Sequence, residues 1–216
     1  MERQSEDNVR QLITGNWKMN GLTAQLEEVE AIAASVTAKP PPADVLVCTP
    51  ATLIARAVQI VAGRIGIGEQ YCHSAIAGAF TGDISAEMLK YADASAVIVG
   101  HSERRRAHGT TGYHLHRRDA ITAQRRQRIV RVRRSDRRQI VQMHTHIRHC
   151  LEARLGAEGK AVRILYGGSV KPSNAREILA LPEVGGALIG NASLKATDLE
   201  DIIRAVSRQA EPSMAA

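Results

Sequence analysis

Apolar and polar positions follow two different periods along most of the chain. Short apolar runs, typical of buried parallel strands, alternate with stretches whose apolar residues recur at helical spacing, as Leu26, Val29, Ala33 and Val36 do. A repeated order of strand and helix predicts an α/β fold built around a parallel sheet.

The pattern predicts six strands and the helices between them. The predicted strands are Leu12–Asn16, Val45–Thr49, Arg64–Glu69, Ala96–Gly100, Ala161–Tyr166 and Ala187–Ile189. The predicted helices are Thr23–Val36, Leu53–Val61, Ser85–Tyr91, Ile147–Leu155, Asn174–Leu179 and Leu199–Val206. A complete eight-stranded barrel needs two more strands. Their place in the order falls after Gly109 and before Met143.

Charge separates this middle region from the rest of the chain. The formal net charge of the 216 residues is +7, yet residues 104–148 hold fourteen arginines against two acids, Asp119 and Asp136. Residues 110–142 also lack a sustained helical or strand period, and Ile129–Arg133 alternates too briefly to predict a strand. We interpret the chain as a single domain, residues 1–216, interrupted by an atypical Arg-rich segment at about 110–142.

The Arg-rich segment admits several interpretations. Clustered arginines neutralise phosphates in nucleic-acid-binding arms, but Tyr113 is the one aromatic residue available for base stacking, so a nucleic-acid partner is disfavoured. A solvated stretch without function is the simpler interpretation. A third hypothesis is that this segment was translated in a shifted reading frame and that part of the coding sequence was lost. A GC-rich coding sequence that is translated in a shifted frame gives an Arg-rich amino-acid sequence without hydrophobic periodicity.

Other sequence features limit the class of protein. Three cysteines without metal-type spacing fit a reducing cytosol, and no apolar run is long enough for a membrane span, so we expect a soluble cytoplasmic protein. His144, His146 and His149 cluster, but their spacing does not place all three on one helical face and no Cys or carboxylate completes a set. We therefore expect no metal site.

Three fragments carry a resemblance to a known family. They are Gly15-Asn-Trp-Lys-Met-Asn-Gly21, Ala96-Val-Ile-Val-Gly-His-Ser-Glu-Arg-Arg105 and Arg163-Ile-Leu-Tyr-Gly-Gly-Ser-Val-Lys-Pro172, each a strand followed by a polar or glycine-rich turn. Together they resemble triosephosphate isomerase over roughly residues 11–109 and 143–207. The resemblance implies a TIM (β/α)8 barrel, left incomplete here by the Arg-rich segment.

The resemblance also implies a reaction and a set of site residues. The family interconverts dihydroxyacetone phosphate and glyceraldehyde 3-phosphate in glycolysis and gluconeogenesis, without metal or organic cofactor. His101 matches the family's catalytic histidine, and the helix that starts at Ser102 would favour its neutral form. Lys18 matches the catalytic and substrate-binding lysine, Asn16 a substrate-binding amide, and Glu103 a supporting acid near the lysine.

Two further features follow from the resemblance. Backbone N–H groups of glycine-rich turns would bind the substrate phosphate at Gly168, Ser169, Gly190 and Asn191. The family usually has a second glycine where this chain has Asn191; because Asn tolerates positive φ, we expect the turn to survive with reduced affinity. Gly78-Ala-Phe-Thr-Gly-Asp83 resembles the family's dimer-forming loop, which makes Thr81 an interface residue of a homodimer.

One catalytic part has no counterpart in the sequence. The family's catalytic base is a glutamate in a Tyr-Glu-Pro-Val-Trp segment at the end of the sixth strand, followed by a lid that excludes water. Neither is present, and no Asp or Glu lies between Asp136 and Glu152. Loss of two strands would also leave the edges of the fourth and seventh strands unpaired, unless Ile129–Arg133 or a second chain covers them.

Two interpretations of function therefore stay open. The first is a triosephosphate isomerase by descent whose turnover is in doubt because the base is missing. The second is a non-catalytic or degenerate remnant that at most binds phosphate or a partner. A different phosphate-binding barrel enzyme is disfavoured, because Asn-Trp-Lys and His-Ser-Glu-Arg-Arg occur in the order and spacing of the resembled family.

Overall fold

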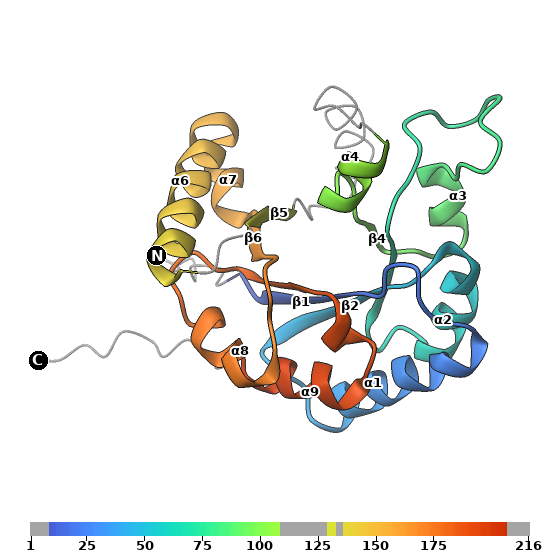
Figure 1. Ribbon diagram of the computed structural model, residues 1–216, viewed down its shortest axis with the longest axis horizontal. Coiled ribbons are helices and arrows are strands. Elements are labelled where there is room, and N and C mark those ends of the chain that lie inside the picture. The colour runs from blue at the N-terminus through green and yellow to red at the C-terminus, as the bar shows by residue number, and fades with distance from the viewer. Residues whose placement is uncertain (1–8, 109–128, 133–135, 207–216) are drawn as a thin grey trace, which may run out of the picture.

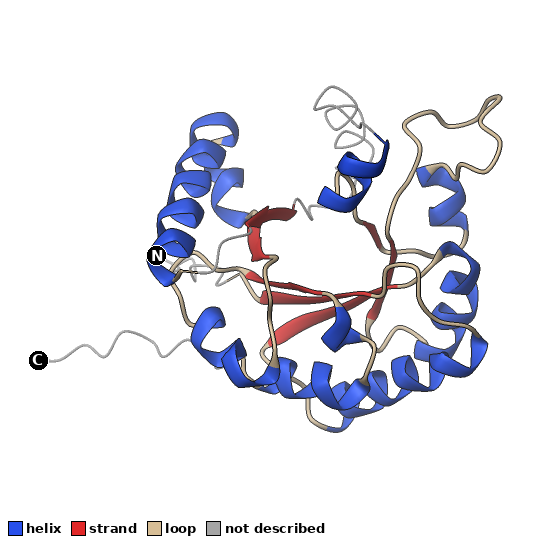
Figure 2. Ribbon diagram, in the orientation of Figure 1, coloured by secondary structure: helices blue, strands red, loops and turns tan. Residues whose placement is uncertain are grey.

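The computed structural model describes residues 9–108, 129–132 and 136–206. In these residues seven parallel strands form one sheet in the order β4-β3-β2-β1-β7-β6-β5. The sheet curls around a centre, and the helices lie on its outer side (Figure 1 and Figure 2). This is a (β/α) barrel of the TIM type that is incomplete, with β4 and β5 as the two ends of the described sheet.

All six predicted strands are present. The strands are β1 (Gln11–Asn16), β2 (Ala43–Cys48), β3 (Gly66–Glu69), β4 (Ala96–Val97), β5 (Ile129–Val132), β6 (Arg163–Tyr166) and β7 (Gly186–Ile189). The fourth is shorter than predicted. It pairs with β3 through Gly68↔Ala96 and Glu69↔Val97. The sheet order gives β4 no partner on its other side among the described residues, which removes the pairing that would extend it to Gly100.

The predicted helices are also present, with shifted ends. The helices are α1 (Leu26–Ala38), α2 (Ile54–Val61), α3 (Ala86–Tyr91), α4 (Ser102–His108), α6 (Arg137–Leu155), α7 (Ala157–Ala161), α8 (Pro172–Leu179) and α9 (Ala196–Arg204). Short 3-10 turns are η1 (Thr23–Gln25), η2 (Ala51–Leu53) and η3 (Asn191–Ser193). Ser85 caps α3, because its hydroxyl accepts a hydrogen bond from the Met88 backbone N–H at 3.3 Å.

In the middle region one question that the sequence left open is answered, and one predicted helix start is wrong. Ile129–Val132 does form a strand: β5 pairs with β6 in parallel from Ile129↔Arg163 to Val132↔Tyr166, because the edge of β6 supplies the partner that a short alternation lacks alone. The edge of the family's seventh strand, here β6, is therefore covered. The helix predicted at Ile147 begins ten residues earlier, at Arg137, because Asp136 accepts a hydrogen bond from Arg138 N–H at 3.0 Å.

The strand residues face two layers in alternation. Ile13, Val45, Val47 and Ile67 belong to a large core that also contains residues from the helices. The alternate positions Leu12, Leu46, Cys48 and Leu165 form a separate cluster, which lies on the inner face of the curled sheet. Each fully buried aliphatic side chain of this kind stabilises the fold by about 1.5–3 kcal/mol.

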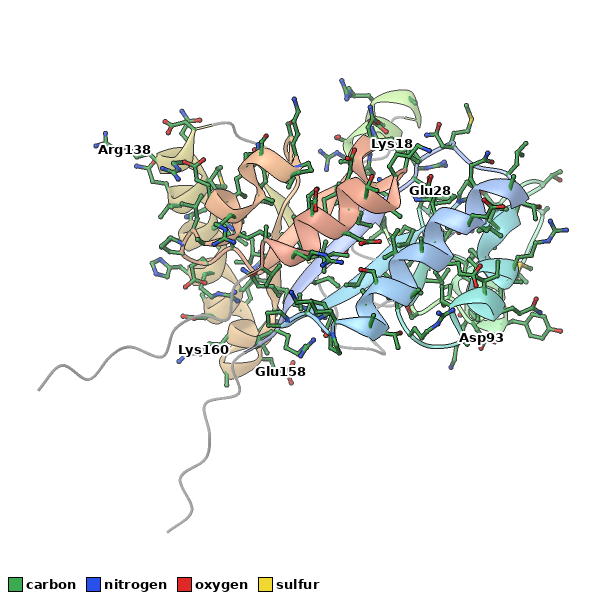
Figure 3. All side chains as sticks on the ribbon, turned by 90° about the horizontal axis from the view of Figure 1, so that it is seen from below. Lys18, Glu28, Asp93, Arg138, Glu158 and Lys160 are labelled. Atoms are coloured by element: carbon green, nitrogen blue, oxygen red, sulfur yellow. The ribbon has the colours of Figure 1, made fainter. Side chains whose placement is uncertain are left out.

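The strands all run in one direction, so their carboxyl ends meet at one end of the barrel. Lys18, just after β1, lies at that end, and Glu158 and Lys160 of the α7 segment lie at the opposite end (Figure 3). Chemistry in parallel barrels is located at the carboxyl ends of the strands. We therefore expect the functional residues on the loops after β1, β4, β6 and β7.

Candidate functional site

The loop after β1 holds Lys18 in an unusual backbone conformation. Lys18 has φ +56°, in the left-handed region that a residue with a side chain adopts at a cost of about 1–2 kcal/mol. Three contacts fix it there. Its N–H donates to Asn16 Oδ1 at 3.0 Å, its carbonyl accepts from Gln70 Nε2 at 2.7 Å, and the Cys48 carbonyl accepts from the neighbouring Trp17 N–H at 3.0 Å.

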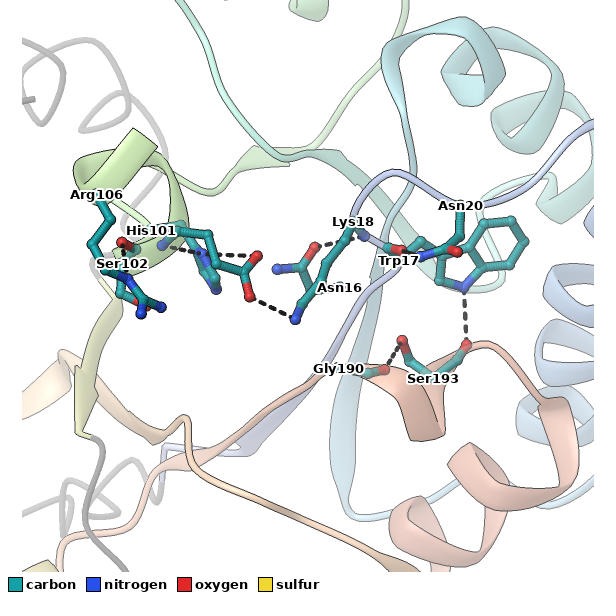
Figure 4. A network of polar contacts seen from close by, with 10 residues as sticks. Asn16, Trp17, Lys18, Asn20, His101, Ser102, Arg106, Gly190 and Ser193 are labelled. Atoms are coloured by element: carbon teal, nitrogen blue, oxygen red, sulfur yellow. Dashed lines mark hydrogen bonds and ion pairs between the residues drawn. The ribbon is translucent and has the colours of Figure 1, made fainter. Parts of the chain in front are cut away.

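Trp17 connects this loop to the turn after β7. Its side chain is buried, and its indole Nε1–H donates to the Ser193 carbonyl at 2.9 Å. Ser193 in turn donates through its hydroxyl to the Gly190 carbonyl at 2.7 Å. Figure 4 shows this chain of contacts from Trp17 through Ser193 to Gly190, beside Lys18. The two loops therefore keep a fixed relation to each other.

His101 and Glu103 reach Lys18 from the loop after β4. Lys18 Nζ and Glu103 Oε1 are 2.7 Å apart, and the Glu103 backbone N–H donates to His101 Nδ1 at 3.2 Å (Figure 4). Glu103 Oε2 is also 3.6 Å from Nδ1, a distance too long for a hydrogen bond. An Nδ1 that accepts a hydrogen bond carries no hydrogen of its own, so this contact assigns the ring the tautomer with its hydrogen on Nε2.

His101 is buried, with 8% of its surface exposed, and it directly precedes α4. The Arg105 N–H donates to the His101 carbonyl at 3.0 Å, which makes the histidine part of the first turn of that helix. Its ring is thus set by a helix that follows a strand end. The Nε2–H of such a tautomer is a kind of donor suited to an oxyanion.

Two glycine-rich turns form the other side of the site. At Gly168 an added Cβ would lie 2.1 Å from the Tyr166 hydroxyl oxygen, so any other residue there would displace the Tyr166 side chain. At Gly190 an added Cβ would lie 3.7 Å from Lys18 Cε, which places the turn after β7 directly against the lysine. Exposed backbone N–H groups in such turns and at helix starts are typical anion sites.

Asn191 differs from its expected conformation. The sequence argument gave it a positive φ, but the residues with side chains and positive φ in the described chain are Lys18, Ala62, Asp93 and Glu183. Asn191 begins the 3-10 turn η3 with a negative φ. The expected reason for a weakened turn is therefore wrong, because no glycine conformation is required there.

The segment after η3 is anchored by a carboxylate from α1. Glu28 accepts from Lys195 Nζ at 2.8 Å and from the Ala196 backbone N–H at 2.7 Å. These two hydrogen bonds hold the pKa of Glu28 below its ordinary value. The N-terminus of α9 is thereby fixed beside the turn.

These loops enclose one cavity of about 570 Å³. Its lining brings together eight predicted site residues: Asn16, Lys18, His101, Glu103, Gly168, Ser169, Gly190 and Asn191. The size lies within the usual range for small-molecule sites, about 300–1,000 Å³. Two carboxylates, Glu103 and Asp198, are among the residues that line it in the described chain.

The sequence has no carboxylate in the three positions directly after the strand that corresponds to the family's sixth. The strand in that position, β5, ends at Val132, opposite Tyr166. The sequence continues with Arg133, Arg134 and Ser135, whose placement lies outside the described residues. The part of the cavity that the structure describes therefore has the lysine, the histidine and the glycine turns.

Sequence reasoning missed residues that support or line the site. Gln70 follows the third strand directly, a position that marks it as a loop residue at the active end, but nothing local shows that it binds the Lys18 carbonyl. The contact between Trp17 and Ser193 joins residues 176 positions apart. Asp198 lines the cavity without a motif of its own, and Lys171 lines it from within the third fragment, where the sequence gave it no role.

Other predicted features lie away from the cavity. Thr81 is exposed on the loop between β3 and α3, beside Phe80, which is 45% exposed. His144 is buried on α6 against the Glu183 carbonyl, and His146 lies 3.7 Å from Cys150 Sγ. Within the described residues, no group of three potential metal ligands occurs and no helix has the length and apolar content of a membrane span.

A parallel barrel with an ammonium, an imidazole and glycine-rich turns gathered at the carboxyl ends of its strands has the architecture of the TIM-barrel class. The sequence model of the family "Triosephosphate isomerase" matches residues 11–137 and 128–206 of this chain. The chain belongs to the triosephosphate isomerase family.

Individual relatives of this chain are also triosephosphate isomerases. The chain is 44% identical over 241 aligned positions to the triosephosphate isomerase of Rhodopseudomonas palustris (strain BisA53), covering 88% of this chain and 95% of the relative. It is 43% identical to that of Caulobacter vibrioides, covering 91% and 97%. The crystal structure of triosephosphate isomerase from Bartonella henselae superposes with a TM-score of 0.84 at 36% identity, covering 91% of this chain and 99% of that one.

The alignments to relatives contain gaps in this chain. The alignment to the Rhodopseudomonas relative has 241 positions, more than the 216 residues of this chain, so parts of the relative face gaps here. The family match breaks into two pieces that overlap at residues 128–137. That break coincides with the segment that holds β5 and the start of α6.

Proposed function

We propose that this chain binds a phosphorylated triose in the cavity and stabilises its enediolate form, with isomerase turnover far below that of complete family members. The observation that carries the proposal is the lining of a single cavity by Lys18, His101 and both glycine turns. The turns would take the phosphate, and Lys18 with the His101 Nε2–H would face the carbonyl oxygen. This division of roles supports dihydroxyacetone phosphate and glyceraldehyde 3-phosphate as the ligands.

The missing base limits the reaction. Isomerisation removes a proton from the carbon beside the carbonyl and returns it to the neighbouring carbon, while the oxygen carries the developing charge. General base catalysis supplies about 10²–10⁴ in rate. With no carboxylate in the sequence from Val132 to Ser135, we expect turnover at least about 100-fold below a complete member.

A coupled assay of the purified chain tests this. It is compared with a variant in which residues 110–135 are replaced by the fifth- and sixth-strand region of the Rhodopseudomonas palustris relative, including its lid. We expect the replacement to raise turnover by at least about 100-fold. Equal rates in the two proteins would show that another group acts as the base, and the proposal would fail.

The alternative is a non-catalytic remnant that at most binds phosphate or a partner, and the coupled assay separates it from a weak enzyme; anion binding tests the cavity itself. Titration with phosphoglycolate, a phosphorylated two-carbon acid, should show binding that inorganic phosphate displaces. A folded chain that binds neither anion would support the remnant.

The dimer and the location are further parts of the proposal. The exposed loop around Thr81, with Phe80 and Ile76 also exposed, is suited to a homodimer contact. The free cysteines Cys48, Cys72 and Cys150 fit the reducing cytoplasm. Sedimentation of wild type beside Thr81→Arg would test the dimer, which the variant should dissociate.

A further inference from the structure

A buried carboxylate lies outside the cavity lining, at the end of β3. Glu69 is 8% exposed, and its Oε2 has no hydrogen-bond partner among the described residues. A buried polar atom without a partner costs about 1–3 kcal/mol. Burial of Glu69 in this position therefore destabilises the fold, and packing alone does not account for a carboxylate there.

Arg104 of α4 carries the opposite charge and also has a buried side-chain atom without a hydrogen-bond partner in the described part of the chain. Its Nε is buried and also has no hydrogen-bond partner among the described residues. Its guanidinium carbon lies 3.6 Å above the ring of Tyr71, a cation–π contact that contributes about 0.5–2 kcal/mol. Arg104 is thus held against the ring of Tyr71, which follows Glu69 by two residues, and its charge acts to lower the pKa of the Glu69 carboxyl.

The charges of the two residues interact. Burial raises the pKa of Glu69 to about 7, against the lowering effects of a backbone hydrogen bond from Gln70 and of the Arg104 charge. Cys48 of β2 also interacts with Glu69 through charge, and burial raises the pKa of that thiol far above the physiological range. The thiol therefore stays neutral, and Arg104 is the charged partner from a neighbouring element.

The route from Glu69 to the site is short. β3 pairs with β4 at Glu69↔Val97, and the Ile98 N–H donates to the Glu69 carbonyl at 2.8 Å. The chain then reaches His101 and enters α4, which carries Glu103 and Arg104 in consecutive positions. A shift of Arg104 moves the same helical turn that sets the His101 ring and the Glu103 carboxylate.

We propose that Glu69 is a positioning residue for the site: through Arg104 it fixes the first turn of α4, and with it His101 and Glu103. The proposal rests on the proposed function in assigning His101 to ligand binding. It predicts that Glu69 affects the half of the site that faces the carbonyl end of the ligand, and not the phosphate turns after β6 and β7.

The first test uses Glu69→Gln, which keeps the shape and removes the charge. Binding of phosphoglycolate, which reaches both halves of the site, should weaken about 5-fold or more. Binding of inorganic phosphate, which needs the turns at Gly168 and Gly190, should stay within about 2-fold. Asp44→Asn is the matched control: Asp44 is another strand carboxylate paired to arginine, but it pairs with Arg10 and Arg163, away from α4.

The second test asks whether Glu69 acts through Arg104. Arg104→Met should lower the ratio of the two affinities as Glu69→Gln does, and the double variant should be no worse than either single one. Arg106→Met, on the same helix with an exposed side chain, should leave the ratio unchanged. Additive losses in the double variant would overturn the proposed route.

The third test does not need a ligand. In wild type the Arg104 Nε–H and the His101 ring resonances should shift together with a midpoint near pH 7 as Glu69 ionises, and in Glu69→Gln the Arg104 shift should disappear. If wild type binds neither anion but shows this shift, the proposed function fails and the positioning role stands. A variant with unchanged resonances and an unchanged affinity ratio would refute the positioning role itself.

Discussion

Lys18 is predicted to weaken the fold slightly and to carry much of the ligand affinity. Its φ of +56° costs about 1–2 kcal/mol for a residue with a side chain, and none for glycine. Glycine lowers the free energy of unfolding by about 0.5–1 kcal/mol relative to alanine, because it has greater conformational freedom in the unfolded chain. Lys18→Gly should therefore be about 0.5–1 kcal/mol more stable than Lys18→Ala.

The ion pair of Lys18 does not change this comparison, since both variants lose it. The Lys18 and Glu103 side chains are 37% and 50% exposed, and a pair with that exposure contributes about 0–1 kcal/mol. Affinity should behave differently. A hydrogen bond from a charged donor contributes about 1.5–3 kcal/mol, so both variants should lose about 10- to 150-fold in affinity for phosphoglycolate.

Denaturant unfolding and calorimetric titration measure the two effects separately. Lys39→Ala is the control, because Lys39 is exposed at the end of α1 and does not line the cavity. It should change neither quantity appreciably. A Lys18→Ala protein as stable as Lys18→Gly would show that the backbone is not strained, and unchanged phosphoglycolate binding would show that the ammonium does not face the ligand.

Two predictions concern stability. The pKa of His144 is lowered, first by burial, so its neutral form is favoured in the folded state; the unfolded chain then binds more protons, and stability should fall as pH drops through about 6.5 toward the folded pKa. His144→Leu should remove that slope in unfolding titrations from pH 7.5 to 5, and a slope that persists would contradict the assignment. Gly186→Ala should cost about 2–4 kcal/mol, because a Cβ there would lie 2.0 Å from the Leu12 carbonyl oxygen between β1 and β7. Gly63→Ala, also at positive φ but with no atom within 4 Å, should cost about 1–2 kcal/mol, so equal losses would exclude the steric explanation.

Periodicity was sufficient for the strands whose residues are buried on both faces. β1 and β2 read as apolar runs because Leu12 and Leu46 face the inside while Ile13 and Val45 face the helices. The strand at Ile129 could not be predicted in this way, because its formation depends on the open edge of β6, more than thirty residues away. α7 gave no signal either; its Gly159 packs against the Leu151 backbone, a contact that no local pattern shows.

The residues of the site also differ in whether a local sequence pattern could predict them. Asn16, Lys18, His101 and the glycine turns could be predicted because each stands in a short fragment with a specific order of residues. Their supports could not, since Gln70 and Ser193 contribute through contacts chosen by the packing of distant loops. At Asn191 the sequence led to a wrong expectation. A positive φ was expected because the family has a glycine there, and Asn191 in η3 does not adopt a positive φ.

The order of the strands in the described sheet explains how Lys18, His101 and the glycine turns are brought to one cavity. Lys18 and the glycine turns follow β1, β7 and β6, which are consecutive in the sheet and joined by direct pairing. His101 follows β4, which is joined to β1 through β3 and β2. None of these pairings passes between β4 and β5, so the support of Lys18, His101 and the glycine turns does not depend on a strand between those two. α4 follows β4 at an end of the described sheet, and in the proposed positioning role Glu69 and Arg104 supply part of the hold that a neighbouring strand would give. A variant with the fifth and sixth strands restored should therefore depend less on Glu69 than the present chain does, and an equal effect of Glu69→Gln in both proteins would contradict this account.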